Sequence, residues 1–144
     1  MAALVLSGSL ALIGCAGASQ ATAPDPAPAA TMSKSANAPG LKKGAYLTHE
    51  RYLSTMTEYS SSRVVLFFHA PWCPDCRKTE KNLASSGVPD GLVVVKVDYD
   101  TATELKAKYG ITKQHTFVLL DATGKPLRTF TGTFDGASIK DALT

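Results

Sequence analysis

A run of five apolar residues that leads into two closely spaced cysteines places the strongest constraint on the fold of this chain. Residues 64–68 are Val, Val, Leu, Phe and Phe, a composition typical of a strand buried on both faces in the middle of a parallel sheet. A helix pattern begins soon afterwards, with Cys73 at its N-terminus and Pro74 at its first position, where a missing N–H group costs nothing. The sequence therefore predicts a strand, a turn and a helix that present a cysteine pair at the end of a central strand.

The two cysteines of this unit are expected to differ in role. Free backbone N–H groups and the positive end of the helix dipole favour the thiolate of Cys73, so this residue is the candidate nucleophile and is expected to be exposed. Cys76 lies one turn further on, on the helix face that carries Thr79 and Leu83. We therefore expect Cys76 to be more buried and to act as the resolving thiol.

Two other interpretations of the cysteine pair have less support. A structural zinc site needs two further Cys or His ligands, and the sequence has neither a second C-x-x-C nor an H-x-x-x-H. Cysteines that only pack a core have no reason to flank the start of a helix after a Trp-Cys pair.

Composition limits the function classes open to the chain. For 144 residues we expect one domain of about 100 residues, acting as a monomer. The net charge is only +3, and Lys and Arg alternate with Asp and Glu, which favours neither a nucleic-acid surface nor a polybasic membrane patch. Only three cysteines are present, so the chain is not a small domain held together by disulfides.

The N-terminal residues 1–15 are interpreted as an export signal. They are almost all apolar or small, and the apolar run is too short to span a bilayer. The sequence Leu12-Ile13-Gly14-Cys15 resembles the lipobox of bacterial lipoproteins, which implies cleavage before Cys15, lipidation of that cysteine and an extracytoplasmic, membrane-anchored protein. The usual basic residues are absent from positions 1–3, so an ordinary cleaved signal peptide or an unprocessed apolar tail are the alternatives.

The rest of the chain divides into a tether and a globular part. Residues 16–40 are rich in Ala, Ser, Thr and Pro and have no apolar periodicity, which predicts a disordered or polyproline tether that gives an anchored domain its reach. Residues 41–144 predict alternating helices and strands. Helices are expected at 48–60 with Thr48 as N-cap, after Cys73, from a capping box at 101–104 to Gly110, and around Ile139, Ala142 and Leu143. Strands are expected at 64–68, 92–98, 116–120 and 127–131, the last two joined by a hairpin turn.

This order of elements predicts an α/β fold with helices on both faces of a mixed sheet. Several residues within it together resemble the thioredoxin family. They are Trp72-Cys73-Pro74-Asp75-Cys76, Lys96 and Asp100 around the second strand, Lys108-Tyr109-Gly110-Ile111, and Gly132 before the last helix. The resemblance covers about residues 44–144 and implies a sheet of about four to five strands. It also implies a thiol–disulfide oxidoreductase without a bound cofactor, which exchanges with a protein or small-molecule disulfide and a dithiol electron donor.

Two departures from the family bear on the mechanism. Asp75 stands where thioredoxin has a proline, and a carboxylate near Cys73 favours the thiol, which tilts the expected direction of exchange towards reduction of the substrate. The buried aspartate of the family falls on Phe67, so Lys96 is expected to have lost its carboxylate partner. Deprotonation of Cys76 would then use water or another group.

A third departure is His115, which with Thr116 aligns with the cis-Pro and Thr that contact substrate in the family. Because a cis bond at a residue other than proline costs ~3 kcal/mol, a rearranged trans loop with His115 as filler is one interpretation. A second interpretation is that His115 acts as a base or tunes the pKa of Cys73. It predicts that the pH profile of Cys73 alkylation shows a histidine-like inflection at about pH 6–7, and that His115→Pro removes this inflection while keeping the fold. As a further alternative, His115 joins Cys73 and Cys76 in a metal-binding or metal-delivery module. His69, at the end of the central strand, is another candidate for these roles, and its alternative interpretation is a polar strand end with its hydrogen bonds satisfied.

Trp72 also has two interpretations. Its ring either shields the disulfide and contacts substrate, or only caps the core.

Overall fold

The computed structural model describes residues 42–144. The signal peptide, Cys15 and the tether predicted at 1–40 lie outside these residues. The described elements run in the order β1 (Ala45–Thr48), α1 (His49–Thr55), the 3₁₀-helix η1 (Met56–Tyr59), β2 (Arg63–His69), α2 (Pro74–Ser86), β3 (Leu92–Asp98), α3 (Thr103–Tyr109), β4 (Thr116–Leu120), β5 (Pro126–Phe130) and α4 (Gly136–Asp141). None of the helices in this range combines the length and apolarity needed to cross a bilayer.

The five strands form one mixed sheet in the order β1-β3-β2-β4-β5. β2 lies at its centre, parallel to β3 and antiparallel to β4, while β1 adds to β3 in parallel and β5 to β4 antiparallel. The two parallel pairs arise where helices connect the strands, and the antiparallel pair β4–β5 arises from the hairpin. The mixed sheet expected from the sequence is confirmed.

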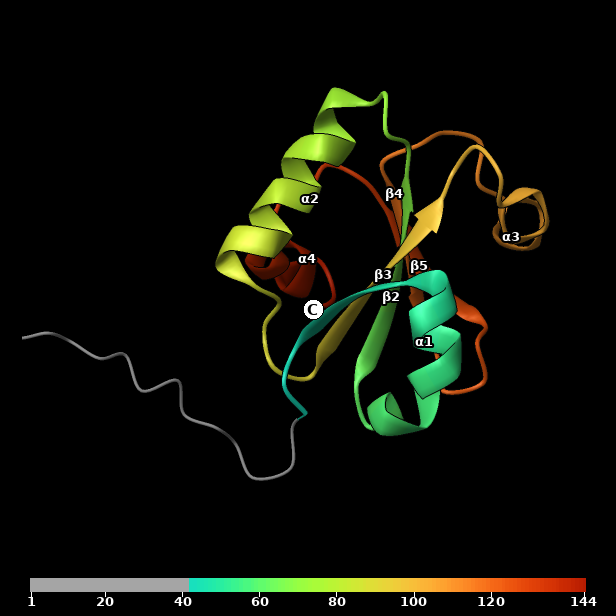
Figure 1. Ribbon diagram of the computed structural model, residues 1–144. Coiled ribbons are helices and arrows are strands. Elements are labelled where there is room, and N and C mark those ends of the chain that lie inside the picture. The colour runs from blue at the N-terminus through green and yellow to red at the C-terminus, as the bar shows by residue number, and fades with distance from the viewer. Residues whose placement is uncertain (1–41) are drawn as a thin grey trace, which may run out of the picture. The chain divides into compact units, whose positions relative to one another are not determined.

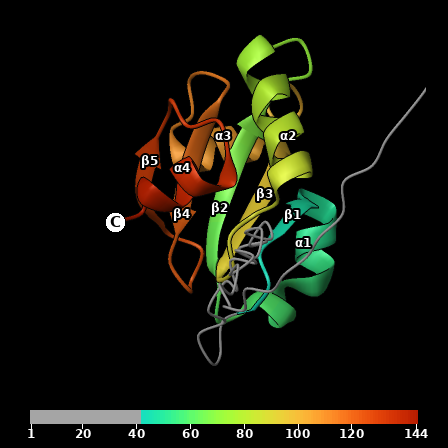
Figure 2. The ribbon, with the colours of Figure 1, turned by 90° about the vertical axis from the view of Figure 1, so that its left-hand side faces the viewer.

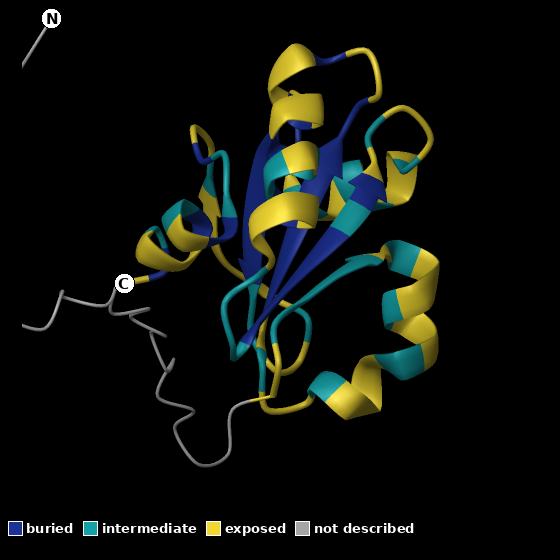
Figure 3. Cartoon of the chain, turned by 60° about the vertical axis from the view of Figure 1, so that its left-hand side comes forward, coloured by how far each residue is buried: buried dark blue, intermediate teal, exposed yellow. Residues whose placement is uncertain are grey.

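Helices cover both faces of the sheet, as Figures 1 and 2 show. On one face, α2 and α4 bury Leu83 and Ile139 against Phe67, Phe117 and neighbouring strand residues. On the other face, α1 and α3 pack partly buried side chains against a second set of valines and leucines. The central strands are therefore buried on both sides over most of their length, as Figure 3 shows by its dark blue arrows, because residues 64–68 of β2 and residues 92–95 of β3 are continuous apolar runs.

The N-terminal part of the domain differs from the expectation in two ways. Strand β1 was not expected, and it forms because Ala45–Thr48 pairs in register with Val93–Lys96. The helix expected at 48–60 is divided into α1 and the 3₁₀-helix η1. Its predicted N-cap is confirmed, since the Thr48 side chain accepts a hydrogen bond from the backbone of Arg51 at 3.3 Å.

The capping box expected at 101–104 is wrong. Helix α3 begins at Thr103, its N-cap Ala102 has no side-chain cap, and the turn before it is held instead by the Asp98 carboxylate, which accepts from the backbone of Asp100 and Thr101. The predicted end of this helix is confirmed, because Gly110 closes it in the left-handed conformation with φ 64°.

Candidate active site

The cysteine pair lies where the central strand β2 passes into helix α2. Cys73 is the N-cap of α2 and Pro74 is its first residue, as the sequence predicts. The Cys73 sulfur accepts a hydrogen bond from the backbone N–H of Cys76 at 3.4 Å. The thiol of Cys73 thus takes the place of a capping oxygen at the positive end of the helix, where a thiolate is stabilised.

Both cysteines are free thiols, and both are buried. Cys76 is fully buried and Cys73 retains 4% of its exposure, so the expected order is confirmed but the expected exposure of Cys73 is wrong. Burial raises the pKa of the Cys76 thiol well above its ordinary value, and hydrogen bonds from the backbone of Ala70 and His115 offset only part of this. Cys76 is therefore a thiol that must lose a proton before it can react.

The exposed rim of the site is formed by the residues that flank Cys73. Trp72 is 55% exposed, so it does not cap the core. Its indole N–H donates to the Asp100 carboxylate at 3.0 and 3.2 Å, which holds the ring at the surface beside the cysteine. Pro74 and Asp75 are exposed in the first turn of α2. The rim offers an aromatic surface and carboxylates to an approaching partner.

His115 lies in the interior and not on the rim. It is 8% exposed, its Nε2 lies 2.9 Å from the Thr79 hydroxyl, and its ring stacks on Phe134 with centroids 5.1 Å apart. Burial lowers the pKa of His115 below its usual range, partly offset by the charge of Asp75, so any inflection that it gives to Cys73 alkylation lies at lower pH than that of an ordinary histidine. This geometry favours the interpretation of His115 as a packed residue.

Thr116, the other residue of this loop, is also turned inward. It is buried at the start of β4, and its hydroxyl donates to the carbonyl of Lys113 at 2.9 Å.

The backbone conformation of His115 argues against the expectation that His115→Pro keeps the fold intact. His115 has φ 54°, whereas a proline ring fixes φ near −65°, and the His115 N–H donates to Phe68 at 2.9 Å. We predict that His115→Pro lowers the free energy of unfolding by more than about 1 kcal/mol relative to His115→Asn, because asparagine tolerates a positive φ. Urea unfolding of both variants measures the difference, and equal stabilities would contradict this account of the loop.

A polar cluster of His69, Glu80 and Lys96 lies one helical turn beyond Cys76. Lys96 binds Oε1 of Glu80 through its Nζ at 2.7 Å, and Nε2 of the buried His69 lies 3.1 Å from Oε2 of the same side chain. Position 67 holds Phe67 where the family has its aspartate, and helix α2 supplies Lys96 with another carboxylate in its place. Burial works to raise the pKa of Glu80, but Lys96 and His69 hold it below the ordinary value.

Glu80 is the residue that the sequence interpretation missed. It lies four residues after Cys76, so the two share one face of α2, and this spacing was the available signal.

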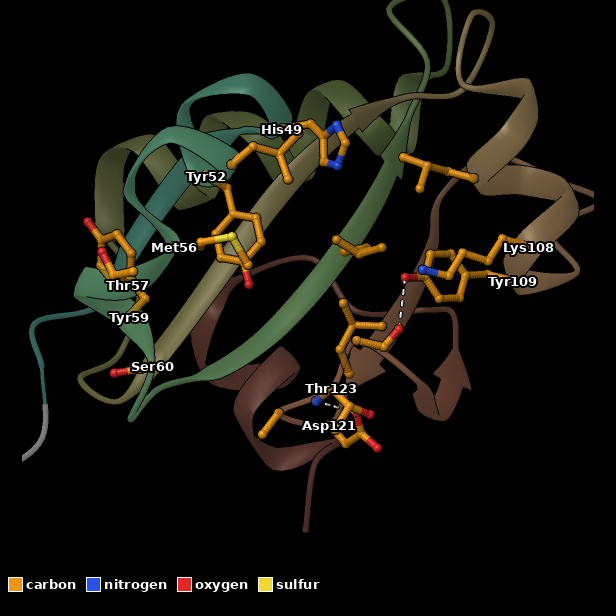
Figure 4. Close-up of a pocket in the computed structure, with 16 residues that line it drawn as sticks. His49, Tyr52, Met56, Thr57, Tyr59, Ser60, Lys108, Tyr109, Asp121 and Thr123 are labelled. Atoms are coloured by element: carbon orange, nitrogen blue, oxygen red, sulfur yellow. Dashed lines mark hydrogen bonds between the residues drawn. The ribbon is translucent and has the colours of Figure 1, made fainter.

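The metal-binding alternative gains no support from residues 42–144. Within them, no three His, Cys, Asp or Glu side chains lie close enough together to hold a metal ion. A cavity of about 650 Å³ lies on the opposite face of the sheet, where Figure 4 shows Tyr52 and Met56 on one side and Lys108 and Tyr109 on the other. Neither cysteine lines it.

The comparisons with known proteins agree with this geometry. The family model described as Thioredoxin matches residues 43–144. The chain is 36% identical over 63 residues to a thioredoxin-like protein of Fusarium culmorum, covering 41% of this chain and 52% of that one. It is 30% identical over 86 residues to a probable thioredoxin-2 of Caenorhabditis elegans, covering 58% and 59%. The chain thus spans little more than half the length of these curated relatives.

A solved structure gives the same result. The germline-specific thioredoxin Deadhead of Drosophila melanogaster superposes with a TM-score of 0.52 at 28% identity, covering 67% of this chain and 91% of that one. With the family model matched over residues 43–144 and a cysteine pair at the β2–α2 junction, this chain belongs to the thioredoxin family.

Proposed function

We propose that this protein is a thiol–disulfide oxidoreductase in which Cys73 is the nucleophile and Cys76 the resolving thiol. The observation that carries the proposal is the Cys73 sulfur at the N-terminus of α2, hydrogen-bonded by the Cys76 backbone, with the Cys76 thiol fully buried behind it. Cys73 retains 4% exposure and Cys76 none, which supports Cys73 as the sulfur that a partner meets first. The exposed Trp72 beside it gives a flat apolar surface against which a disulfide-bearing chain can pack.

The exchange then proceeds in two balanced steps. The Cys73 thiolate attacks one sulfur of the substrate disulfide, forms a mixed disulfide and releases the other substrate sulfur as a thiolate. The Cys76 thiol loses its proton and attacks the Cys73 sulfur, which forms the Cys73–Cys76 disulfide and releases the second substrate sulfur. Two electrons pass from the dithiol to the substrate, and an external dithiol restores the protein.

Reduction of the substrate is the proposed direction. The carboxylate of Asp75 lies in the first turn of α2 between the two cysteines, and negative charge at this position supports action as a reductant over action as an oxidant. Purified protein should accelerate the reduction of insulin disulfides by a dithiol donor over the rate with donor alone. A rate equal to that of the donor would remove the proposed function.

We also propose that the protein works outside the cytoplasm, anchored through Cys15. This rests on the apolar run before Leu12-Ile13-Gly14-Cys15 and on the Ala- and Pro-rich residues 16–40. In a bacterium that processes lipoproteins, Cys15→Ser should move the protein from the membrane to the soluble fraction, while Cys73→Ser should leave it in the membrane. Wild-type protein found in the soluble fraction, with no lipid mass on its N-terminal peptide, would contradict the anchor.

A further inference from the structure

The cavity of about 650 Å³ lies on the face of the sheet that α1 and α3 cover, and neither cysteine lines it. Leu66 of β2 and Leu120 of β4 contribute to it from the sheet. One wall comes from α1 and η1, and the facing wall comes from α3 and the turn between β4 and β5 (Figure 4). Small-molecule sites in proteins are typically hollows of about 300–1,000 Å³ with a mainly apolar lining. The cavity has the size of such a site.

The wall from α1 and η1 carries an apolar stripe that the domain leaves largely open to solvent. The stripe consists of Tyr52, Leu53, Met56 and Tyr59, which recur at helical spacing and all line the cavity. Neither α1 nor η1 contains a buried residue, and Leu53 and Met56 are 53% and 49% exposed. Two of the four exposed large hydrophobic side chains within residues 42–144 thus line one cavity. Exposed apolar surface gathered in one place marks a site of interaction.

The facing wall carries a positive charge. Lys108 of α3 lines the cavity, with its Nζ 5.0 Å from the centre of the Tyr109 ring. The ion-pair contacts within residues 42–144 are all made by Glu80, so Lys108 has no carboxylate partner in this part of the chain. Tyr109 is fixed in turn, because its hydroxyl donates to the carbonyl of Gly124 at 3.1 Å. The cavity therefore combines an apolar stripe with an unpaired cation.

The other charged groups of the lining leave Lys108 available to an anion. Asp121 is the carboxylate among them, and its Oδ1 already accepts from the backbone of Thr123 and Lys125 and from the Thr123 hydroxyl. This carboxylate is thus engaged within its own turn. His49, the first residue of α1, carries either a positive charge or none. A negatively charged ligand group beside Lys108 therefore gains an ion pair without displacing one.

We propose that this cavity binds an amphipathic monoanion, a single apolar chain that ends in a carboxylate, of the class of medium-chain fatty acids. The chain lies along the apolar stripe, and the carboxylate binds the Lys108 ammonium group. The stripe extends over residues 52–59, about 10 Å of helix, which suits an extended chain better than a single ring. Apolar area removed from water supplies the affinity, and the charge pair favours an anion over a neutral chain. The site goes beyond the proposed disulfide exchange and does not depend on it.

Decanoate and decan-1-ol, which have the same apolar chain and differ in charge, test the proposal on the full chain. Titration calorimetry, with decanoate kept below the concentration at which it forms micelles, measures the affinity for each probe. We expect saturable one-to-one binding of decanoate to the wild type. Lys108→Gln should weaken decanoate binding about three- to fivefold and leave decan-1-ol binding within about twofold, because only the charge pair is lost.

Each variant has a matched control. Lys106→Gln should change neither affinity, since Lys106 also lies on α3 with its Nζ over a tyrosine ring, that of Tyr99, but does not line the cavity. Met56→Glu places a carboxylate in the apolar stripe and should weaken decanoate binding about tenfold or more. Leu127→Glu makes the same change at an exposed residue of β5 outside the lining and should have no effect. Both glutamates replace exposed side chains, so we expect the fold to persist.

Three results would overturn the proposal. The first is the absence of saturable decanoate binding to the wild type, and the second is binding that Met56→Glu leaves unchanged, because the probe then lies on another surface. The third is an equal loss in Lys106→Gln and Lys108→Gln, which would be a general effect of charge. Sedimentation of the wild type tests another occupant. A dimer that Met56→Glu dissociates would mean that a second copy of the chain covers the stripe, and it would overturn the ligand as well.

Discussion

Cys73→Ser is expected to reduce disulfide exchange to the rate of the dithiol donor alone, whereas Cys76→Ser should complete the first step and stop before the second. The difference follows from position, because the Cys73 sulfur caps the N-terminus of α2 and the Cys76 sulfur is fully buried. The hydroxyl that Cys73→Ser introduces is a much weaker nucleophile than a thiolate. A serine at 76 cannot release the partner, so Cys76→Ser should accumulate mixed disulfides through Cys73.

Trapping is measured by incubating each variant with oxidised substrate, blocking free thiols and locating the adducts by peptide mass. Both variants should be made with Cys15 replaced by serine, so that the remaining thiol is the only site of attachment. The control is the Cys15→Ser protein with both motif cysteines, which should turn over without accumulating adducts. Equal trapping by Cys73→Ser and Cys76→Ser would reverse or remove the assigned roles.

The elements that the sequence predicted well are those with the strongest local patterns. Strand β3 has the predicted bounds Leu92–Asp98, since a continuous run of valines is compatible with little else than a buried strand. The start of α2 was also predictable, because Pro74 at the first helical position and two cysteines one turn apart need no tertiary information.

The features that the sequence did not reveal depend on contacts between distant residues. Strand β1 has only four residues and exists through its pairing with β3, nearly fifty residues away, so no local periodicity indicates it. The turn before α3 is a shorter-range case, held by Asp98, whose carboxylate accepts from the backbone of Asp100 and Thr101.

The polar cluster beside the cysteines shows the same limit. The loss of an acidic residue at position 67 was visible in the sequence, but its replacement required knowing that Glu80 on a helix reaches Lys96 on a neighbouring strand. Likewise, the sequence identified His115 as unusual without showing that its φ is positive and its ring is buried. Spacing along one helix predicts which residues share a face, whereas the partner across the interface comes only from the fold.

The substitution with the largest expected effect on stability is Phe67→Ala. Phe67 is fully buried and stacks on Phe117 with ring centroids 4.6 Å apart and planes 4° from parallel, and Phe117 in turn stacks on Phe130 at 5.3 Å. The His115 ring meets Phe67 edge-on at 5.7 Å. Removing the Phe67 ring leaves a cavity in the centre of the sheet, so we expect the free energy of unfolding to fall by about 3–5 kcal/mol.

Such a loss is a large share of the roughly 5–15 kcal/mol that stabilises a typical domain, so the variant should unfold at much lower urea concentration. Phe130→Ala is the matched control, because it removes the same side chain from the edge strand β5, where the ring is only half-buried. Its loss should be clearly smaller, since solvent already reaches that end of the stack. Equal losses for the two variants would mean that the aromatic stack is not anchored at Phe67. Folded Phe67→Ala should still accelerate the reduction of insulin disulfides. The reason is that the position of Cys73 depends on the start of α2 and not on the aromatic stack.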